Sequence, residues 1–284
     1  MAGLFTGEAL AWGLTGHRIV TEAAADRTPA PLDSFFHAWR ERIADESLVP
    51  DTILKDRDPG EKIRHYINIE ELEEEAFKTL PRTRAEAEKR YGKKRLEKAG
   101  LLPWTILDEL GELERAFGAG DGVEIAARAG RLAHYVADAH QPLHLTKNYD
   151  GKETCNAGIH AAFETHMIER NAAAYRKSTG RVPGVVGPFE DPFEAVMVMM
   201  RESHPLAAEI LKADRSALHA LKDQGSDYYR ALHKRAGPIA ESRISAAADA
   251  LASLWYTAWV SAGRPAAPTE EPPPATARPK APFE

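Results

Sequence analysis

The chain has 284 residues, of which 43% are hydrophobic and 28% charged, enough for one sizeable core. Its net charge of −6 at pH 7 argues against a protein that holds nucleic acid by surface charge alone. The single cysteine, Cys155, excludes an internal disulfide. No run of about twenty uncharged apolar residues is present, so we expect no membrane span.

The N-terminus carries a pattern typical of signal-peptide processing. Ala9-Leu10-Ala11 is an A-x-A sequence directly before Trp12, and signal peptidase cuts after such sequences. The preceding residues lack a basic region and a complete apolar stretch, so this pattern alone leaves cleavage and chance equally open. We interpret residues 1–11 as the remnant of a signal peptide or other processed segment.

Helical signals follow one another along the rest of the chain. Asp33 and Asp121 stand where helix caps are expected, and Pro103 stands in a first helical turn. No segment alternates with period two over the length of a strand. The ranges expected to be helical are 12–26, 33–43, 61–80, 82–99, 103–117, 121–139, 157–177, 192–213, 216–235 and 238–262. The sequence therefore predicts an all-α fold.

The composition changes at Gly263, after which the chain is rich in proline and alanine with almost no bulky residues. Such a segment cannot bury enough apolar surface to order itself. We therefore expect a single multi-helix domain over residues 12–262 and a flexible tail over 263–284.

The stretch HYVADAHQPLH, residues 134–144, gathers three histidines and one aspartate. His134 and Asp138 are four residues apart, which on a helix places both side chains on one face. At this spacing both can reach one metal ion, at distances of about 2 Å. Pro142 ends or bends the helix, so His144 can turn toward the same cavity.

A second segment repeats this arrangement. His160 and Glu164 in GIHAAFE have the same four-residue spacing. One such pair is common on helices that bind no metal, because residues at this spacing interact on any helix surface. Two pairs, with His144 between them in the sequence, favour a shared metal cavity.

Two further stretches supply isolated candidate ligands. Asp51 ends the sequence VPD and His65 begins HYIN, while Trp12 and His17 lie in WGLTGH. Taken alone, an aspartate after proline usually forms a turn or cap, and a histidine at a helix start is usually an exposed polar residue.

In chain order, W-G-x-x-G-H, D…H-Y, H-x-x-x-D-x-H-Q-P-L-H and H-x-x-F-E resemble the three-zinc phosphodiesterases. That superfamily contains the bacterial zinc-dependent phospholipases C and the zinc-dependent single-strand nucleases. The matched positions run from Trp12 to Glu164, more than half of the chain, and HYVADAHQPLH is the most specific part. Asp51 is the least specific match, because Asp56 and Asp58 lie nearby, but its Pro-Asp context favours it.

The resemblance implies up to three Zn²⁺ ions in a cleft between helices. The first would be bound by Asp51, His65, His134 and Asp138, the second by His144, His160 and Glu164, and the third by His17 and the free amine and carbonyl of Trp12, with Asp138 bridging. A peptide nitrogen is a poor zinc ligand, so the third site requires Trp12 as the mature N-terminus. The resemblance therefore favours cleavage after Ala11 and a periplasmic or secreted protein.

The resemblance also implies hydrolysis of a phosphoester by a zinc-activated hydroxide, since zinc lowers the pKa of bound water to about 7. Asp51 would orient or deprotonate the nucleophile. The expected substrate is a phosphodiester, in a phospholipid head group or in single-stranded nucleic acid. We expect no stable membrane insertion and no protein partner.

The substrate branch stays open. Glu164 in an H-x-x-aromatic-E setting and the short gap between His144 and His160 favour a phospholipase C-like enzyme, which is our first choice. The W-G-x-x-G-H start and HQPLH favour a single-strand nuclease or nucleotidase, although Leu54 and Lys55 stand where that branch commonly carries an arginine. A metal-binding interaction protein without activity is the third alternative.

Overall fold

The computed structural model describes residues 12–73, 76–180, 184–221, 225–269 and 272, and within these ranges it contains helices and no strand. This confirms the predicted all-α class. The α-helices are α1 (Gly13–Arg27), α2 (Asp33–Ala38), α3 (Arg40–Glu46), α4 (Lys55–Arg57), α5 (Ala76–Thr79), α6 (Arg84–Tyr91), α7 (Lys93–Ala99), α8 (Leu102–Ala119), α9 (Gly122–Ala139), α10 (Ile159–Ala161), α11 (Ile168–Arg170), α12 (Ala172–Thr179), α13 (Pro192–Ser203), α14 (Leu206–Leu221) and α15 (Ser226–Ser261). The other helical turns are the π-turns η1 (Pro50–Leu54) and η6 (Ala162–Met167) and the 3-10 turns η2 (Lys62–Arg64), η3 (Ile69–Glu71), η4 (Pro142–Leu145) and η5 (Lys152–Thr154).

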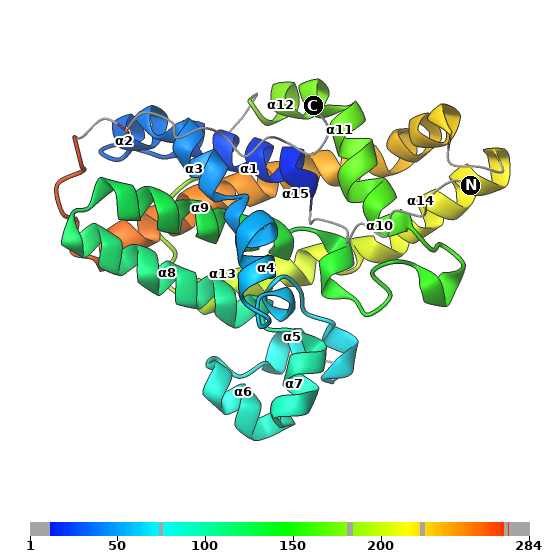
Figure 1. Cartoon of the computed structure of the whole chain (residues 1–284), viewed down its shortest axis with the longest axis horizontal. Helices are drawn as coiled ribbons and strands as arrows, with labels where there is room; N and C mark the ends of the chain where they lie inside the picture. Colours follow the sequence, from blue (N-terminus) through cyan, green and yellow to red (C-terminus); the bar gives the residue numbers. More distant parts are fainter. Residues whose placement is uncertain (1–11, 74–75, 181–183, 222–224, 270–271, 273–284) are drawn as a thin grey trace.

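Helix α9 lies at the centre of the fold. It contacts α1, α3, α8, α13 and α15, and Figure 1 shows it beside α8 and α15, with α5, α6 and α7 projecting from one side of the body. Two buried indoles donate hydrogen bonds to its backbone, Trp255 to Ala129 O at 3.1 Å and Trp12 to Ala137 O at 2.7 Å. These bonds and the surrounding helices hold the α9 backbone in place within the core.

Two predicted helix starts agree with the structure. The Asp121 carboxylate accepts hydrogen bonds from the amides of Val123 and Glu124, at 2.9 and 3.1 Å, and so caps α9. Pro103 lies in the first turn of α8, where its missing N–H costs no hydrogen bond.

Other predicted helices have the wrong extent. The range 33–43 is divided at Trp39 between α2 and α3. The range 61–80 is not one helix, because its backbone bonds to remote segments; the amide of Ile67, for example, donates to His144 O at 2.9 Å. The break expected before Pro238 does not occur, and α15 runs through this proline. The packing of α15 against α1, α8 and α14 outweighs the loss of one helical hydrogen bond.

The predicted domain limits lie partly outside the described residues. Residues 1–11 are not described, nor are most of residues 270–284. At the start of the expected tail, Pro265 O accepts a hydrogen bond from the Trp259 indole at 2.8 Å. Among the helices that are described, none combines the length and hydropathy needed to cross a bilayer.

A close approach of α3 to α9 positions the end of α3. A Cβ added to Gly130 of α9 would lie 2.7 Å from the carbonyl oxygen of Ile43, closer than real Cβ contacts. This approach brings the carbonyl of Ser47, just after α3, to 2.8 Å from the Nδ1 atom of His134.

The Gly130→Ala variant should lower the free energy of unfolding by about 1–3 kcal/mol, because α3 must move away from an overpacked contact. Gly111→Ala in α8 is the matched control, since its added Cβ meets only a side-chain nitrogen of Arg115 at 3.8 Å. That control should keep or raise the stability by up to about 1 kcal/mol, as alanine favours helix over glycine. Urea unfolding measures both, and equal stabilities would contradict the tight contact.

Candidate metal centre

The residues predicted as ligands are all buried, each less than a tenth exposed. They come from seven parts of the fold: Trp12 and His17 from α1 and its N-cap, Asp51 from η1, His65 from the residue after η2, His134 and Asp138 from α9, His144 from η4, His160 from α10 and Glu164 from η6. Segments far apart in the chain thus direct these polar side chains into the core.

All of these residues except Trp12 form three groups, and within each group the ligand atoms lie within 4.8 Å of one another. The groups are His17, Asp51 and His134; His65, His134 and Asp138; and His144, His160 and Glu164. The third group is the set predicted for the second zinc. The first two groups share His134 and together contain the four residues predicted for the first zinc.

His65 makes the closest contacts around His134, the histidine that the first two groups share. Its Nδ1 atom lies 2.9 Å from His134 Nε2, 3.1 Å from Asp138 Oδ2 and 3.6 Å from Asp51 Oδ1. The His17 ring stacks on His134, with centroids 3.9 Å apart, and its Nε2 atom is 3.6 Å from Asp138 Oδ1. Asp138 therefore stands between His65 and His17, where a bridging carboxylate was predicted.

The second region is equally compact. His160 Nε2 lies 2.8 Å from Glu164 Oε2 and 3.1 Å from His144 Nε2. The buried amide of Gln141 donates to Glu164 Oε2 at 2.7 Å and helps to fix this carboxylate. His144 Nδ1 is 3.8 Å from Asp138 Oδ1, so the two regions adjoin.

Backbone carbonyls set the orientation of two histidines. His134 Nδ1 lies 2.8 Å from Ser47 O, and His144 Nδ1 lies 2.7 Å from His65 O. A carbonyl only accepts hydrogen bonds, so each Nδ1 carries the hydrogen and each Nε2 presents a lone pair to the cluster. Histidines that bind metals in proteins are held in this way.

The cluster contains buried polar atoms that have no hydrogen-bond partner in the described residues. They are both ring nitrogens of His17, Oδ2 of Asp51, Oδ1 of Asp138 and Oε1 of Glu164. Each unpaired buried group costs about 1–3 kcal/mol, so several in one place require a common partner. Imidazole nitrogens and carboxylate oxygens are ligands that Zn²⁺ takes in proteins, and the residues present fit that ion.

Two ligand carboxylates lie on π-helical turns. Asp51 belongs to η1 and Glu164 to η6, and the amide of Lys55 bonds to Pro50 O across η1. A π-turn inserts one residue into a helix and often occurs at a functional site. The extra residue changes the direction of the side chains that follow it.

Burial and neighbouring charges shift the pKa values in opposite directions. Burial and the adjacent histidines hold the pKa of His17 well below its usual value. Burial also acts to lower the pKa of His65, but hydrogen bonds to Asp138 and Glu61 outweigh it and raise the pKa to about 9. Burial opposes ionisation of Glu164, yet His160 and His144 lower its pKa to about 2. Glu164 is thus an anion at physiological pH, ready to bind a cation.

Glu61 and Tyr135 lie next to the cluster and were not among the residues predicted from the sequence. Glu61 is fully buried, and its Oε1 atom lies 3.1 Å from His65 Nε2. The hydroxyl of Tyr135 donates to the same carboxylate oxygen. The signal was present, since Glu61 and His65 have the four-residue spacing of the other histidine–carboxylate pairs.

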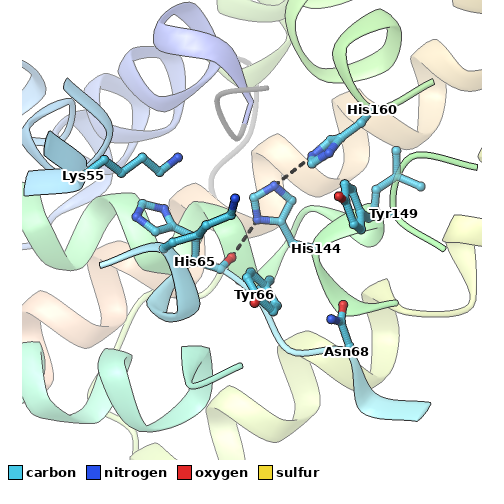
Figure 2. Close-up of a pocket in the computed structure, with 9 residues that line it drawn as sticks. Lys55, His65, Tyr66, Asn68, His144, Tyr149 and His160 are labelled. Carbon is cyan, nitrogen blue, oxygen red and sulfur yellow. Dashed lines mark hydrogen bonds between the residues drawn. The ribbon is translucent and has the colours of Figure 1, made fainter. Parts of the chain in front are cut away.

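The cluster opens into a cavity of about 240 Å³. Its walls include Lys55, Lys62, Tyr66 and Tyr149, and three of the histidines reach it. Figure 2 shows Lys55 pointing toward the histidines from one side, with Tyr66 and Tyr149 next to His144. The Lys55 ammonium lies 2.5 Å from Asp51 Oδ1 and adds a positive charge beside the cluster. The site is therefore buried but open to a small ligand.

The Trp12 side chain bonds to Ala137 O and lies beside Phe163, next in the chain to the ligands Asp138 and Glu164. Its indole is fully buried, and its carbonyl accepts a hydrogen bond from the Gly16 amide at 3.0 Å. The cut that would free its amine falls in residues 1–11, outside the described part of the chain. The role of Trp12 as a ligand stays a prediction.

No family model matches the chain. A probable serine protease of Bradyrhizobium tropiciagri is 27% identical over 188 residues, which cover 57% of this chain and 24% of that protein. Among solved structures, the alpha toxin of Clostridium absonum has a TM-score of 0.52 at 14% identity, covering 87% of this chain and 64% of the toxin. The Clostridium perfringens alpha-toxin gives 0.48 at 12% identity, covering 90% and 66%.

The chain thus spans about a quarter of the protease and less than two thirds of the Clostridium absonum toxin. At this identity the likeness to that toxin concerns the fold, and it agrees with the all-α architecture described above.

Replacing His160 by alanine should lower the zinc content by about one ion per chain, because two ligands rarely hold a structural or catalytic zinc. His166→Ala is the matched control, since this exposed ring lies against Tyr229 and outside the three groups. Elemental analysis of dialysed protein measures both. Equal zinc content in the two variants would contradict the third ligand group.

Proposed function

We propose that the chain is a zinc-dependent hydrolase of phosphodiester bonds. One observation carries the proposal: three adjoining groups of buried histidines and carboxylates contain atoms without hydrogen-bond partners in the described residues, and His65, His144 and His160 of these groups line an open cavity. Such a cluster would keep a surplus of positive charge when filled with divalent cations, and this surplus attracts a phosphate anion. An acidic chain can therefore bind an anionic substrate.

The ligands would be those predicted from the sequence. His65, His134, Asp51 and Asp138 surround one position, while His144, His160 and Glu164 surround another. Bound zinc supplies a Lewis acid for the phosphoryl oxygens and a water of lowered pKa.

Two side chains of the chain itself contribute to the reaction. Asp51 Oδ2 has neither a hydrogen-bond nor an ion-pair partner among the described residues, and it can orient the attacking water and take up its proton. Lys55 holds the other oxygen and lines the cavity, where its charge favours binding of the diester anion.

A phospholipase C-like activity is our first choice of substrate branch. It rests on Glu164 as the last ligand and on the short gap between His144 and His160. A cavity of about 240 Å³ has room for a phosphate and its head group rather than for acyl chains.

A single-strand nuclease or nucleotidase is the second candidate. Tyr66 and Tyr149 line the cavity, and aromatic rings beside a phosphate site provide surfaces on which bases stack.

A metal-binding protein without activity is less well supported. Closed structural zinc sites usually have four protein ligands, whereas the group of His144, His160 and Glu164 has three. This leaves a coordination position for water or substrate next to the cavity.

The choice between a lipid and a nucleic-acid substrate is tested by giving purified zinc-loaded protein phosphatidylcholine or single-stranded DNA. We expect release of phosphocholine, and a fall in kcat of about 100-fold or more in Asp51→Asn, since the variant loses a ligand and a proton acceptor. Asp56→Asn is the matched control on the same segment and should keep full activity, because Asp56 is exposed.

Turnover of DNA without turnover of lipid would favour the nuclease over the phospholipase C-like activity. Hydrolysis of neither diester by the zinc-loaded protein would contradict the proposed function.

Export is the companion proposal, since a third metal site needs a free amine at Trp12. N-terminal sequencing of protein recovered from the periplasm or medium of an expressing bacterium should begin at Trp12. Active protein with three zinc ions and residues 1–11 still attached would contradict the role of this amine.

A further inference from the structure

We propose that Glu61 is a positioning residue, which holds His65 as a metal ligand through its Nδ1 atom, and that Tyr135 holds Glu61 in turn. The inference rests on the proposed metal-dependent function. It concerns two residues outside the predicted ligand set.

The two ring nitrogens of His65 face different partners. Nδ1 faces the cluster, 3.1 Å from Asp138 Oδ2 and 2.9 Å from His134 Nε2. Nε2 faces away from the cluster, 3.1 Å from Glu61 Oε1. An ionised carboxylate only accepts hydrogen bonds, so Nε2 carries a hydrogen toward Glu61. Nδ1, which faces the cluster, is then the nitrogen that would bind a metal in place of its contacts to Asp138 and His134.

His65 therefore has the opposite orientation to two other histidines of the cluster. His134 and His144 bond to backbone carbonyls through Nδ1 and present Nε2. For His65 the carboxylate of Glu61 takes the place of the carbonyl. A carboxylate raises the electron density on the ring more than a neutral carbonyl does, which makes the histidine a stronger ligand.

Glu61 is itself fixed by hydrogen bonds. It is fully buried; Oε1 accepts from the Tyr135 hydroxyl, and Oε2 accepts from Arg64 Nη1 at 2.9 Å. Tyr135 is buried in α9 next to His134, and its ring lies 5.5 Å from the His65 ring. The chain of contacts therefore ties the turn that carries His65 to the helix that carries two further ligands.

The backbone contacts of this turn leave the rotation of the His65 ring to its side-chain contacts. His65 follows the short 3-10 turn η2, and its neighbours bond to distant segments, with Ile67 N donating to His144 O at 2.9 Å. The ion pair between Glu61 and Arg64 does not account for the buried carboxylate, because the Arg64 side chain is 37% exposed and such pairs add little stability. The contact to His65 accounts for the buried Glu61 carboxylate, which orients the His65 ring.

The test compares Glu61→Gln and Tyr135→Phe with the unaltered full-length chain. Zinc affinity is measured by competition with a chromogenic chelator, and the protonated nitrogen of His65 is identified by ¹⁵N NMR in the zinc-loaded protein. Glu61→Gln should weaken one zinc site about 10- to 100-fold and leave the other sites unchanged. Tyr135→Phe should give a smaller loss at the same site.

Glu109→Gln is the matched control. Glu109 is a largely buried carboxylate on α8 that faces Arg128 rather than the cluster, so its variant should bind zinc like the unaltered chain. Thermal unfolding of the metal-free proteins reports any general loss of stability separately from the loss of affinity.

The outcomes separate the two proposals. If the unaltered chain binds no zinc, the proposed function fails. If it binds zinc, but Glu61→Gln changes only the thermal stability and keeps the affinity, Glu61 is not a positioning residue. A His65 signal showing Nδ1 protonated and Nε2 bound to metal would also overturn the inference.

Discussion

The structure depends on one electrostatic constraint. Buried carboxylates and imidazole lone pairs point toward one another, and the described residues supply few hydrogen-bond donors to pair with them. Asp51, Asp138 and Glu164 each keep a buried oxygen that bonds to no donor in the described part of the chain. Their desolvation is unfavourable unless a cation lies between them. The fold must therefore supply enough packing elsewhere to hold these groups together before the cation binds.

The core supplies this packing through α9. The indoles of Trp12 and Trp255 bond to its backbone, and α3 approaches it closely at Gly130. His134 and Asp138 thus stand on a rigid helix, whereas the other ligands lie on turns, on short helices or on α1. Contacts from outside the ligand set, such as Ser47 O on His134 and Glu61 on His65, orient the rings. A long helix and several short turns together form one site.

Local spacing predicted the parts of the site that lie on one stretch of chain. The pairs His134–Asp138 and His160–Glu164 needed only the helical period, and the structure brings both together. The sharing of His134 between two groups depends on how α1 packs against α9 and on the approach of Asp51 to His134, at 3.8 Å, which no local pattern encodes. The π-turns and the unbroken course of α15 through Pro238 are likewise results of tertiary packing. Glu61 is different, since its spacing to His65 was a readable signal.

Anomalous scattering from crystals of the zinc-loaded protein, collected on both sides of the zinc absorption edge, tests the central claim most directly. The account predicts strong peaks between His65, His134 and Asp138 and between His144, His160 and Glu164, with a third beside His17. A map without peaks at these positions, in a crystal that contains zinc elsewhere, would contradict it.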